Sequence, residues 1–189
     1  YIASTATSKQ AFDQVQCLYN RHLSQFPQPV STIEDMFFVK DSDYVLCITR
    51  LGNVYGDMKD QGIINYIIRA LLEGKKLTVN GDGSIVRDYI HIDDVSMLLA
   101  SLVTRSQSEK VSIYNVSSGK GYSINRLIKF VELQNNLKLS VYNAPPKYEK
   151  KSVIGKNLRL VNLLKLRPNY NLGTGLLHTL KKYEGEKTF

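Results

Sequence analysis

A chain of 189 residues with 43% hydrophobic residues is long enough and apolar enough for a globular core, which excludes disorder throughout. Its net charge of +8 comes from 25 basic and 17 acidic residues without a nucleic-acid-binding motif, so we expect an anionic small molecule rather than nucleic acid as ligand. No apolar run approaches the roughly 18 residues of a membrane span and no signal peptide opens the chain, so we expect no membrane association and a cytoplasmic location.

The first quarter of the chain contains one expected helix and one expected strand. Residues 5–23 carry apolar side chains at helical spacing. Residues 44–49 are a nearly unbroken β-rich apolar run, which is typical of a strand buried on both faces of a parallel sheet. Cys17 and Cys47 fall in this helix and this strand, so we expect both to be reduced core residues.

A loop with the sequence RLGNVYG follows the strand at residues 50–56. Ligands of open parallel sheets bind beyond the carboxyl ends of the strands, so this loop is expected to line a binding site. Asn53 within it either contacts a substrate or caps a turn. Residues 62–73 then show helical spacing, and Gly74 is the expected end of that helix.

The most informative stretch is residues 77–95, LTVNGDGSIVRDYIHIDDV. Alternating apolar residues around Gly81–Gly83 predict a strand, a tight turn and a second strand, and the next apolar run predicts a helix with Asp93 as its N-cap. Arg87 lies in the second strand. It points to solvent, pairs with Asp88, or is held to bind an anion, and its planar fork suits a phosphate.

The remaining elements continue the alternation of strands and helices. We expect a strand at residues 112–119, a helix with Ser123 as its N-cap and a strand at residues 137–142. Two helices within residues 157–180 are implied by the family resemblance given below. His178 falls on the last helix with no second histidine nearby in the sequence. We therefore expect it to be structural or exposed rather than a metal ligand.

Three of these motifs, in this order, resemble the extended short-chain dehydrogenase/reductases, the family of NAD-dependent nucleotide-sugar epimerases and dehydratases such as UDP-glucose 4-epimerase. The stretch from Gly81 to Val95 matches the family's substrate-domain signature at every fixed position, residues 50–56 match its asparagine loop, and residues 114–119 resemble its YN strand. The resemblance implies that Arg87 binds a nucleotide diphosphate, that Asn53 contacts the sugar nucleotide and that Asp93 caps a helix.

A loop that usually supplies a second arginine to the phosphates corresponds to residues 144–151, which contain no arginine. Lys147 is the expected substitute among three lysines of this loop, as a point charge without the bidentate fork. The alternative is that the whole loop is solvated and basic.

The proton chemistry of the family depends on a Tyr-x-x-x-Lys pair, in which the lysine holds the cofactor ribose and lowers the pKa of the tyrosine. The corresponding run here places Thr5 in the tyrosine position and keeps Lys9 as the catalytic and cofactor-binding lysine. A threonine hydroxyl is shorter and far less acidic than a phenol. The chain also contains no glycine-rich cofactor turn, so NAD or NADP is implied by resemblance but not expected to bind this chain alone.

The expected fold is α/β, the C-terminal part of a Rossmann-like parallel sheet plus a smaller α/β substrate-binding lobe. Residues 1–52 are expected to end the dinucleotide-binding domain, with an insertion at residues 25–43. Residues 53–189 are expected to form mainly the sugar-nucleotide lobe, with sheet-completing segments near residues 88–118. The first residue is Tyr1 rather than methionine, so we expect the first half of the protein to be missing.

Two functions follow from the resemblance. The chain is the C-terminal portion of an NAD(P)-dependent nucleotide-sugar epimerase, dehydratase or reductase that binds the nucleotide-sugar diphosphate. Alternatively, it is a catalytically inactive remnant or a nucleotide-sugar-binding or interaction module, as Thr5 and the missing cofactor turn indicate. The expected protein partner is the missing half or a second copy of the chain, because an incomplete sheet exposes an apolar edge.

Overall fold

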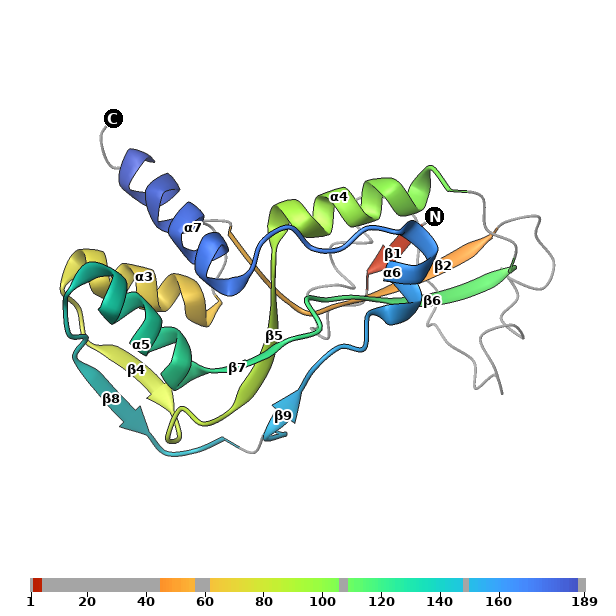
Figure 1. Ribbon diagram of the computed structural model, residues 1–189. Coiled ribbons are helices and arrows are strands. Elements are labelled where there is room, and N and C mark those ends of the chain that lie inside the picture. The colour runs from red at the N-terminus through yellow and green to blue at the C-terminus, as the bar shows by residue number, and fades with distance from the viewer. Residues whose placement is uncertain (1, 5–44, 57–61, 106–108, 148–149, 187–189) are drawn as a thin grey trace, which may run out of the picture. The chain divides into compact units, whose positions relative to one another are not determined.

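The computed structural model describes residues 2–4, 45–56, 62–105, 109–147 and 150–186 (Figure 1). Helices and parallel strand pairs occur together, which confirms the predicted α/β class. The chain divides into two compact units, one formed by Tyr1–Arg50 and Arg105–Tyr114 and the other by Leu51–Thr104 and Asn115–Phe189. Thr5 and Lys9, with the expected insertion at residues 25–43, lie outside the described residues.

The first unit contains a three-stranded sheet in the order β1-β2-β6, formed by β1 (Ile2–Ser4), β2 (Leu46–Leu51) and β6 (Val111–Val116). β1 runs parallel to β2. Cys47 is buried with a free thiol, as predicted, and Cys17 lies outside the described residues. Burial of β2 on both faces is a wrong prediction, because Leu46 and Ile48 alternate with buried residues and stay partly exposed.

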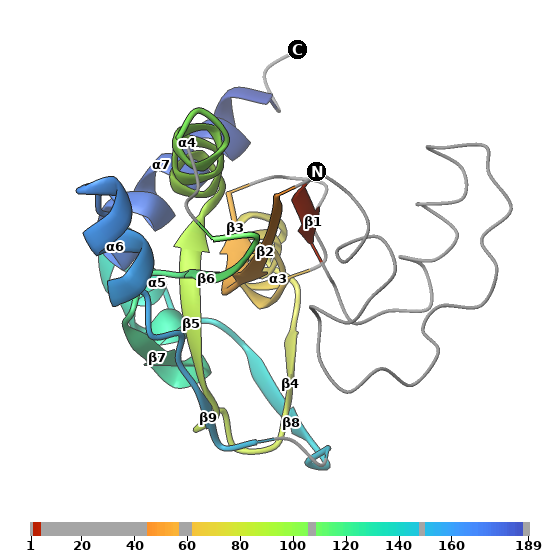
Figure 2. The ribbon, with the colours of Figure 1, turned by 90° about the vertical axis from the view of Figure 1, so that its right-hand side faces the viewer.

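In the second unit, β5 is the central strand of a four-stranded sheet (Figures 1 and 2). Its strands are β3 (Asn53–Tyr55), β5 (Val86–His91), β7 (Gly121–Ser123) and β9 (Ser152–Val153). β3 and β9 pair with β5 in parallel, and β7 pairs with it in antiparallel fashion. A separate parallel ribbon consists of β4 (Leu77–Asn80) and β8 (Val141–Ala144).

Five described helices complete the second unit: α3 (Ile63–Glu73), α4 (Ile92–Val103), α5 (Ile124–Asn135), α6 (Leu158–Leu164) and α7 (Leu172–Glu186). The apolar faces of α3, α5 and α7 pack with β4 into one core that includes Tyr55 and Tyr89. Two predicted helix ends are confirmed, since Gly74 ends α3 in the left-handed conformation and the Ser123 hydroxyl accepts from the Arg126 N–H. None of the described helices combines the length and hydropathy needed to cross a membrane.

The turn between β4 and β5 has the predicted glycine chemistry. Gly81 and Gly83 both have a φ of 73°, a conformation that glycine adopts without a steric penalty. The start of α5 holds this turn in place. The side-chain amide of Asn125 donates to the Asp82 carbonyl at 2.8 Å, and the Asn125 N–H donates to the Gly83 carbonyl at 3.1 Å. The turn that precedes Arg87 is therefore anchored to a helix.

The strand predicted at residues 137–142 begins later than expected. After α5, Asn136 takes the left-handed conformation with a φ of 50°. The Leu139 N–H then donates to the Glu132 carboxylate at 2.9 Å, so this backbone group is satisfied by a side chain instead of a neighbouring strand. Pairing with β4 starts at Val141, opposite Leu77.

Helix α7 approaches β3 so closely that a Cβ at Gly175 would overlap the Tyr55 side chain. A Cβ added to Gly175 would contact the hydroxyl oxygen of Tyr55 and lie 2.9 Å from its Cζ. We expect Gly175→Ala to lower the free energy of unfolding by about 1–3 kcal/mol through overpacking, although alanine normally favours a helix. Adding Tyr55→Phe removes the clashing oxygen and should recover part of the loss in urea unfolding. Equal stability of Gly175→Ala and the parent chain would contradict this packing.

Candidate functional site

Arg87 lies on β5 with a half-buried side chain. Its Nη1 donates to the carbonyl oxygen of Val86 at 2.9 Å and to that of Lys150 at 2.8 Å. Lys150 directly precedes the segment that leads into β9, where Val153 pairs with Arg87. Backbone carbonyls from two segments thus orient the guanidinium at the junction of β5 and β9.

Asp88 has a structural role on the other side of the strand, because successive side chains of a strand point to opposite faces. It is 2% exposed. One carboxylate oxygen accepts from the Ser118 N–H at 2.8 Å and the Ser118 hydroxyl at 2.7 Å. The other accepts from the N–H groups of Gly119 at 2.9 Å and Gly155 at 3.2 Å. These four hydrogen bonds satisfy the Asp88 carboxylate. An ion pair between Arg87 and Asp88, one of the alternatives considered for Arg87, is therefore not needed to explain its burial.

Asn53 and Arg87 lie on the same face of the sheet. Asn53 is exposed and pairs with Tyr89 in the parallel β3–β5 register. Arg87 is two residues before Tyr89, and side chains two residues apart share a face. Strand spacing and rise place the two Cα atoms about 8 Å apart. The fold therefore brings two of the sequence-predicted substrate residues side by side.

Lys147 follows β8 and is exposed. Its segment packs beside the glycine turn, since a Cβ on Gly81 would lie 3.5 Å from Cβ of Pro146. The same segment reaches Arg87 through the Lys150 carbonyl. The loop that carries Lys147 thus borders the Arg87 side chain, in agreement with its expected place but without an arginine of its own.

The expected role of Asp93 as the helix cap is wrong. The N-cap of α4 is His91, whose Nδ1 accepts from the Asp93 N–H at 3.3 Å. Asp93 and Asp94 both lie in the first turn of the helix. The helix begins at Ile92, two residues earlier than an N-cap at Asp93 would give, because the His91 side chain supplies the capping acceptor at the end of β5. A histidine acceptor at an N-cap is a signal that sequence reasoning missed.

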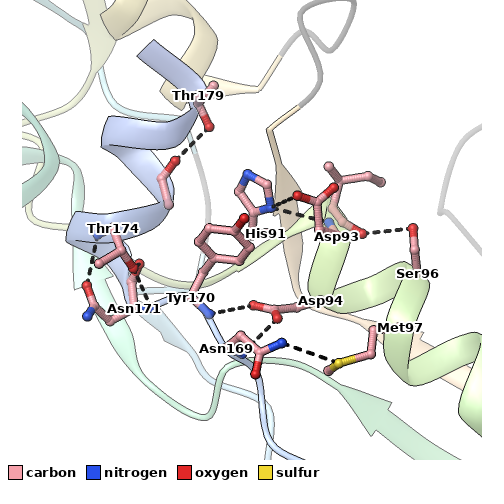
Figure 3. A network of polar contacts seen from close by, with 12 residues as sticks. His91, Asp93, Asp94, Ser96, Met97, Asn169, Tyr170, Asn171, Thr174 and Thr179 are labelled. Atoms are coloured by element: carbon pink, nitrogen blue, oxygen red, sulfur yellow. Dashed lines mark hydrogen bonds and ion pairs between the residues drawn. The ribbon is translucent and has the colours of Figure 1, made fainter. Parts of the chain in front are cut away.

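His91 is the centre of an aromatic group that the sequence did not predict, and Figure 3 shows its ring beside that of Tyr170. The side chain is 2% exposed. Its ring centroid lies 4.2 Å from that of Tyr170, 5.2 Å from that of Tyr55 and 5.3 Å from that of His178. His178 therefore has a second histidine beside it in space. Only the return of α7 to the end of β5 brings the two together.

Asp94 fixes the segment that carries Tyr170 (Figure 3). It is 1% exposed, and its two oxygens accept from the N–H groups of Asn169 at 2.7 Å and Tyr170 at 3.0 Å. The carboxylate thereby holds the connection between α6 and α7 against the start of α4. Tyr170 is stacked on His91 as a consequence.

Burial controls the proton affinities of this region. It raises the pKa of Tyr55 well above its usual range and that of Tyr89 to about 12. Burial lowers the pKa of His91, so its imidazole is neutral at neutral pH. Neither of these two phenols resembles the tyrosine of lowered pKa that proton transfer to a sugar requires.

A hollow of about 630 Å³ lies between α3 and β4. Basic side chains contribute to its wall. Of these, Arg69 donates from Nε to the Tyr183 hydroxyl at 2.7 Å, and Lys75 pairs with Glu73 at 2.8 Å. The residues that line the hollow are Tyr66, Arg69, Ala70, Glu73, Lys75, Lys76, Leu77, Thr78 and Asn80.

Sequence comparison agrees with the motifs. Residues 38–117 match the family model of the NAD dependent epimerase/dehydratase family. The dTDP-L-rhamnose 4-epimerase of Burkholderia thailandensis is 33% identical over 84 residues, 42% of this chain and 23% of that protein. The UDP-arabinose 4-epimerase 1 of Arabidopsis thaliana is 25% identical over 129 residues, 57% of this chain and 31% of that protein.

Solved structures share the fold. The protein MoeE5 in complex with UDP-glucuronic acid and NAD has a TM-score of 0.71 at 20% identity, covering 75% of this chain and 48% of its own. The UDP-glucose 4-epimerase of Thermotoga maritima with UDP-glucose has a TM-score of 0.67 at 23% identity, covering 75% and 46%. The dTDP-glucose 4,6-dehydratase of Bacillus anthracis with NAD has a TM-score of 0.69 at 21% identity, covering 76% and 46%. The chain spans about half the length of these Rossmann-fold structures.

Proposed function

This chain is related over part of its length to the NAD-dependent epimerases and dehydratases of the extended short-chain dehydrogenase/reductase family, and we propose that it supplies the nucleotide-sugar-binding part of such an enzyme. The observation that supports this most is the position of Arg87. Its guanidinium is half-buried, oriented by the Val86 and Lys150 carbonyls, and lies within the matched segment. A guanidinium fixed in this way suits the diphosphate of a nucleotide sugar, whose oxygens match its donors.

Asn53 and Lys147 complete the proposed site. The Asn53 amide offers a donor and an acceptor on the face that carries Arg87, which suits the hydroxyls of a sugar or ribose. Lys147 adds an exposed positive charge from the bordering loop. The proposed ligand is a nucleoside diphosphate sugar, and the proposal does not specify its base or its sugar.

Nicotinamide cofactor binding is assigned to residues beyond the described part of this chain. The related MoeE5 and Bacillus anthracis dehydratase structures contain NAD. A cofactor pyrophosphate needs a glycine-rich turn at a helix N-terminus, and the described strand-to-helix turns lack one. At α4 the first turn carries Asp93 and Asp94, whose charges repel a pyrophosphate. Lys9 is the one cofactor residue proposed for this chain.

A second function, binding without turnover, is favoured by Thr5. A threonine in the tyrosine position lacks the acidic phenol, and Tyr55 and Tyr89 have raised pKa values that do not replace it. Incubation of the native full-length protein with NAD and its bound nucleotide sugar separates the two functions. A chemically changed sugar, resolved by chromatography, supports the enzyme, and an unchanged sugar supports the binding module.

We expect Arg87→Met to weaken nucleotide-sugar binding by about ten- to a hundredfold, since a hydrogen bond to a charged group contributes about 1.5–3 kcal/mol. Arg87→Lys keeps the positive charge without the planar guanidinium, so its affinity should lie between those of the parent chain and Arg87→Met. The measurement is calorimetric titration of UDP-, GDP- and dTDP-sugars into the protein. Arg167→Met, which removes an exposed arginine, is the matched control and should bind as the parent does. Unchanged affinity in Arg87→Met would remove the diphosphate role.

A further inference from the structure

Three side chains with metal-binding atoms meet where β5 ends and α7 returns. A nitrogen of His91, a carboxylate oxygen of Asp93 and a nitrogen of His178 lie within 4.8 Å of one another. We propose that these three residues bind a divalent transition-metal ion of the Zn²⁺ type. This site uses none of the residues of the proposed nucleotide-sugar site, so each proposal can be tested independently of the other.

The spacing of the first two ligands already suits a single ion. Nδ1 of His91 and Oδ2 of Asp93 are 3.4 Å apart. Tetrahedral Zn²⁺ binds nitrogen and oxygen at about 2.0–2.2 Å, which places neighbouring ligand atoms about 3.4 Å from each other. His178 is exposed on α7, so its imidazole can rotate toward the ion. Two imidazoles and a carboxylate form a ligand set that zinc and similar metals prefer.

The present contacts of His91 also favour a cation. Its Nδ1 accepts from the Asp93 N–H at 3.3 Å, so this nitrogen carries a lone pair and not a proton, and a metal ion at Nδ1 would replace this long hydrogen bond. Two acceptors 3.4 Å apart repel each other unless a proton or a cation lies between them. A bound metal ion removes the repulsion without charging the ring.

Ordinary packing leaves part of His91 unexplained. Its Nε2 is buried and has no hydrogen-bond partner among the described residues. Buried polar atoms normally have a partner, so no structural hydrogen bond on that side accounts for a histidine at this position. Stacking against Tyr170 involves the ring face and the helix cap involves Nδ1, so neither contact satisfies Nε2.

Charges around the cluster are mixed. The N-terminus of α4 and Lys182 oppose a cation, and the carboxylates of Asp93 and Asp94 attract it. Three protein ligands leave one tetrahedral position for water, and the exposure of Asp93 and His178 lets the ion exchange with solvent. The ion would link the β5–α4 junction to α7, so its binding should stabilise the folded chain.

The test is calorimetric titration of ZnCl₂ into the tag-free chain after removal of metal with EDTA. We expect one ion per chain and a rise in melting temperature with added Zn²⁺. His178→Ala and Asp93→Asn should each weaken binding at least tenfold, and both should fold because the two side chains are exposed and His91 caps α4. Co²⁺ should give the visible absorption of a tetrahedral site, which both variants should lose.

Lys181→Ala is the matched control, since Lys181 is also exposed on α7. It should bind Zn²⁺ as the parent chain does. Circular dichroism confirms that each variant is folded. Absence of Zn²⁺ binding by the parent chain would overturn the proposal, and so would equal affinity of the parent and both ligand variants.

Discussion

Asp88→Asn will lower the free energy of unfolding by about 3–5 kcal/mol, the usual cost of breaking a buried charged network. The Asp88 carboxylate is 2% exposed and accepts four hydrogen bonds from Ser118, Gly119 and Gly155. An asparagine of the same shape turns one of its two oxygens into an NH₂ group that faces backbone N–H donors. Those donors lose their partner in a buried site, and each orphaned group carries a desolvation penalty.

Urea unfolding of the parent chain and Asp88→Asn at pH 7 measures the change in the free energy of unfolding from the urea midpoint and the dependence of the free energy on urea concentration. The matched control is Asp82→Asn in the β4–β5 turn. Asp82 is exposed and accepts from the N–H and hydroxyl of Ser84, so its replacement should change the midpoint little. If Asp88→Asn unfolds at the midpoint of the control, the four bonds do not hold β5 to the loops.

Asp94→Asn will lower the free energy of unfolding by about 2–4 kcal/mol, because two backbone N–H groups lose part of a charge-assisted acceptor. The effect should concentrate on the Asn169–Tyr170 segment, which the Asp94 carboxylate holds at the start of α4 (Figure 3). Tyr170 should then lose its fixed stacking on His91.

Amide hydrogen exchange followed by NMR reports this local loss directly. In Asp94→Asn the amides of Asn169 and Tyr170 should exchange faster than in the parent chain, beyond the change expected from global stability alone. Asp82→Asn is the control, since it removes an exposed carboxylate from the β4–β5 turn, where its partner is Ser84. Unchanged protection of both amides in Asp94→Asn would show that another contact holds the segment.

The two aspartates illustrate a general feature of this site region. Each lies next to a residue with a proposed function, Asp88 beside Arg87 and Asp94 beside Asp93. The carboxylate of each aspartate accepts hydrogen bonds from backbone N–H groups of loops far away in the sequence. In both pairs the buried carboxylate holds the scaffold, and the neighbouring side chain is left to face a ligand.

Turns and helix ends of this protein follow from residues that are adjacent in the chain. Gly81 and Gly83 predict a turn of positive φ, Gly74 predicts the end of α3, and Ser123 predicts the cap of α5, and all of these predictions are confirmed. The linear order of motifs also predicts the α/β class and the family relation. Each of these features needs only a few consecutive residues, so the amino-acid sequence is enough to predict it.

Contacts between distant segments are decided by the tertiary structure alone. The β3–β5 register that places Asn53 on the face of Arg87, and the return of α7 that places His178 beside His91, depend on packing of the whole second unit. The start of strand β8 differs from the prediction for a related reason, since a side chain of α5 takes a backbone N–H before pairing begins. Periodicity and turn chemistry act over a few residues, whereas register and side-chain clustering are decided by which faces bury each other.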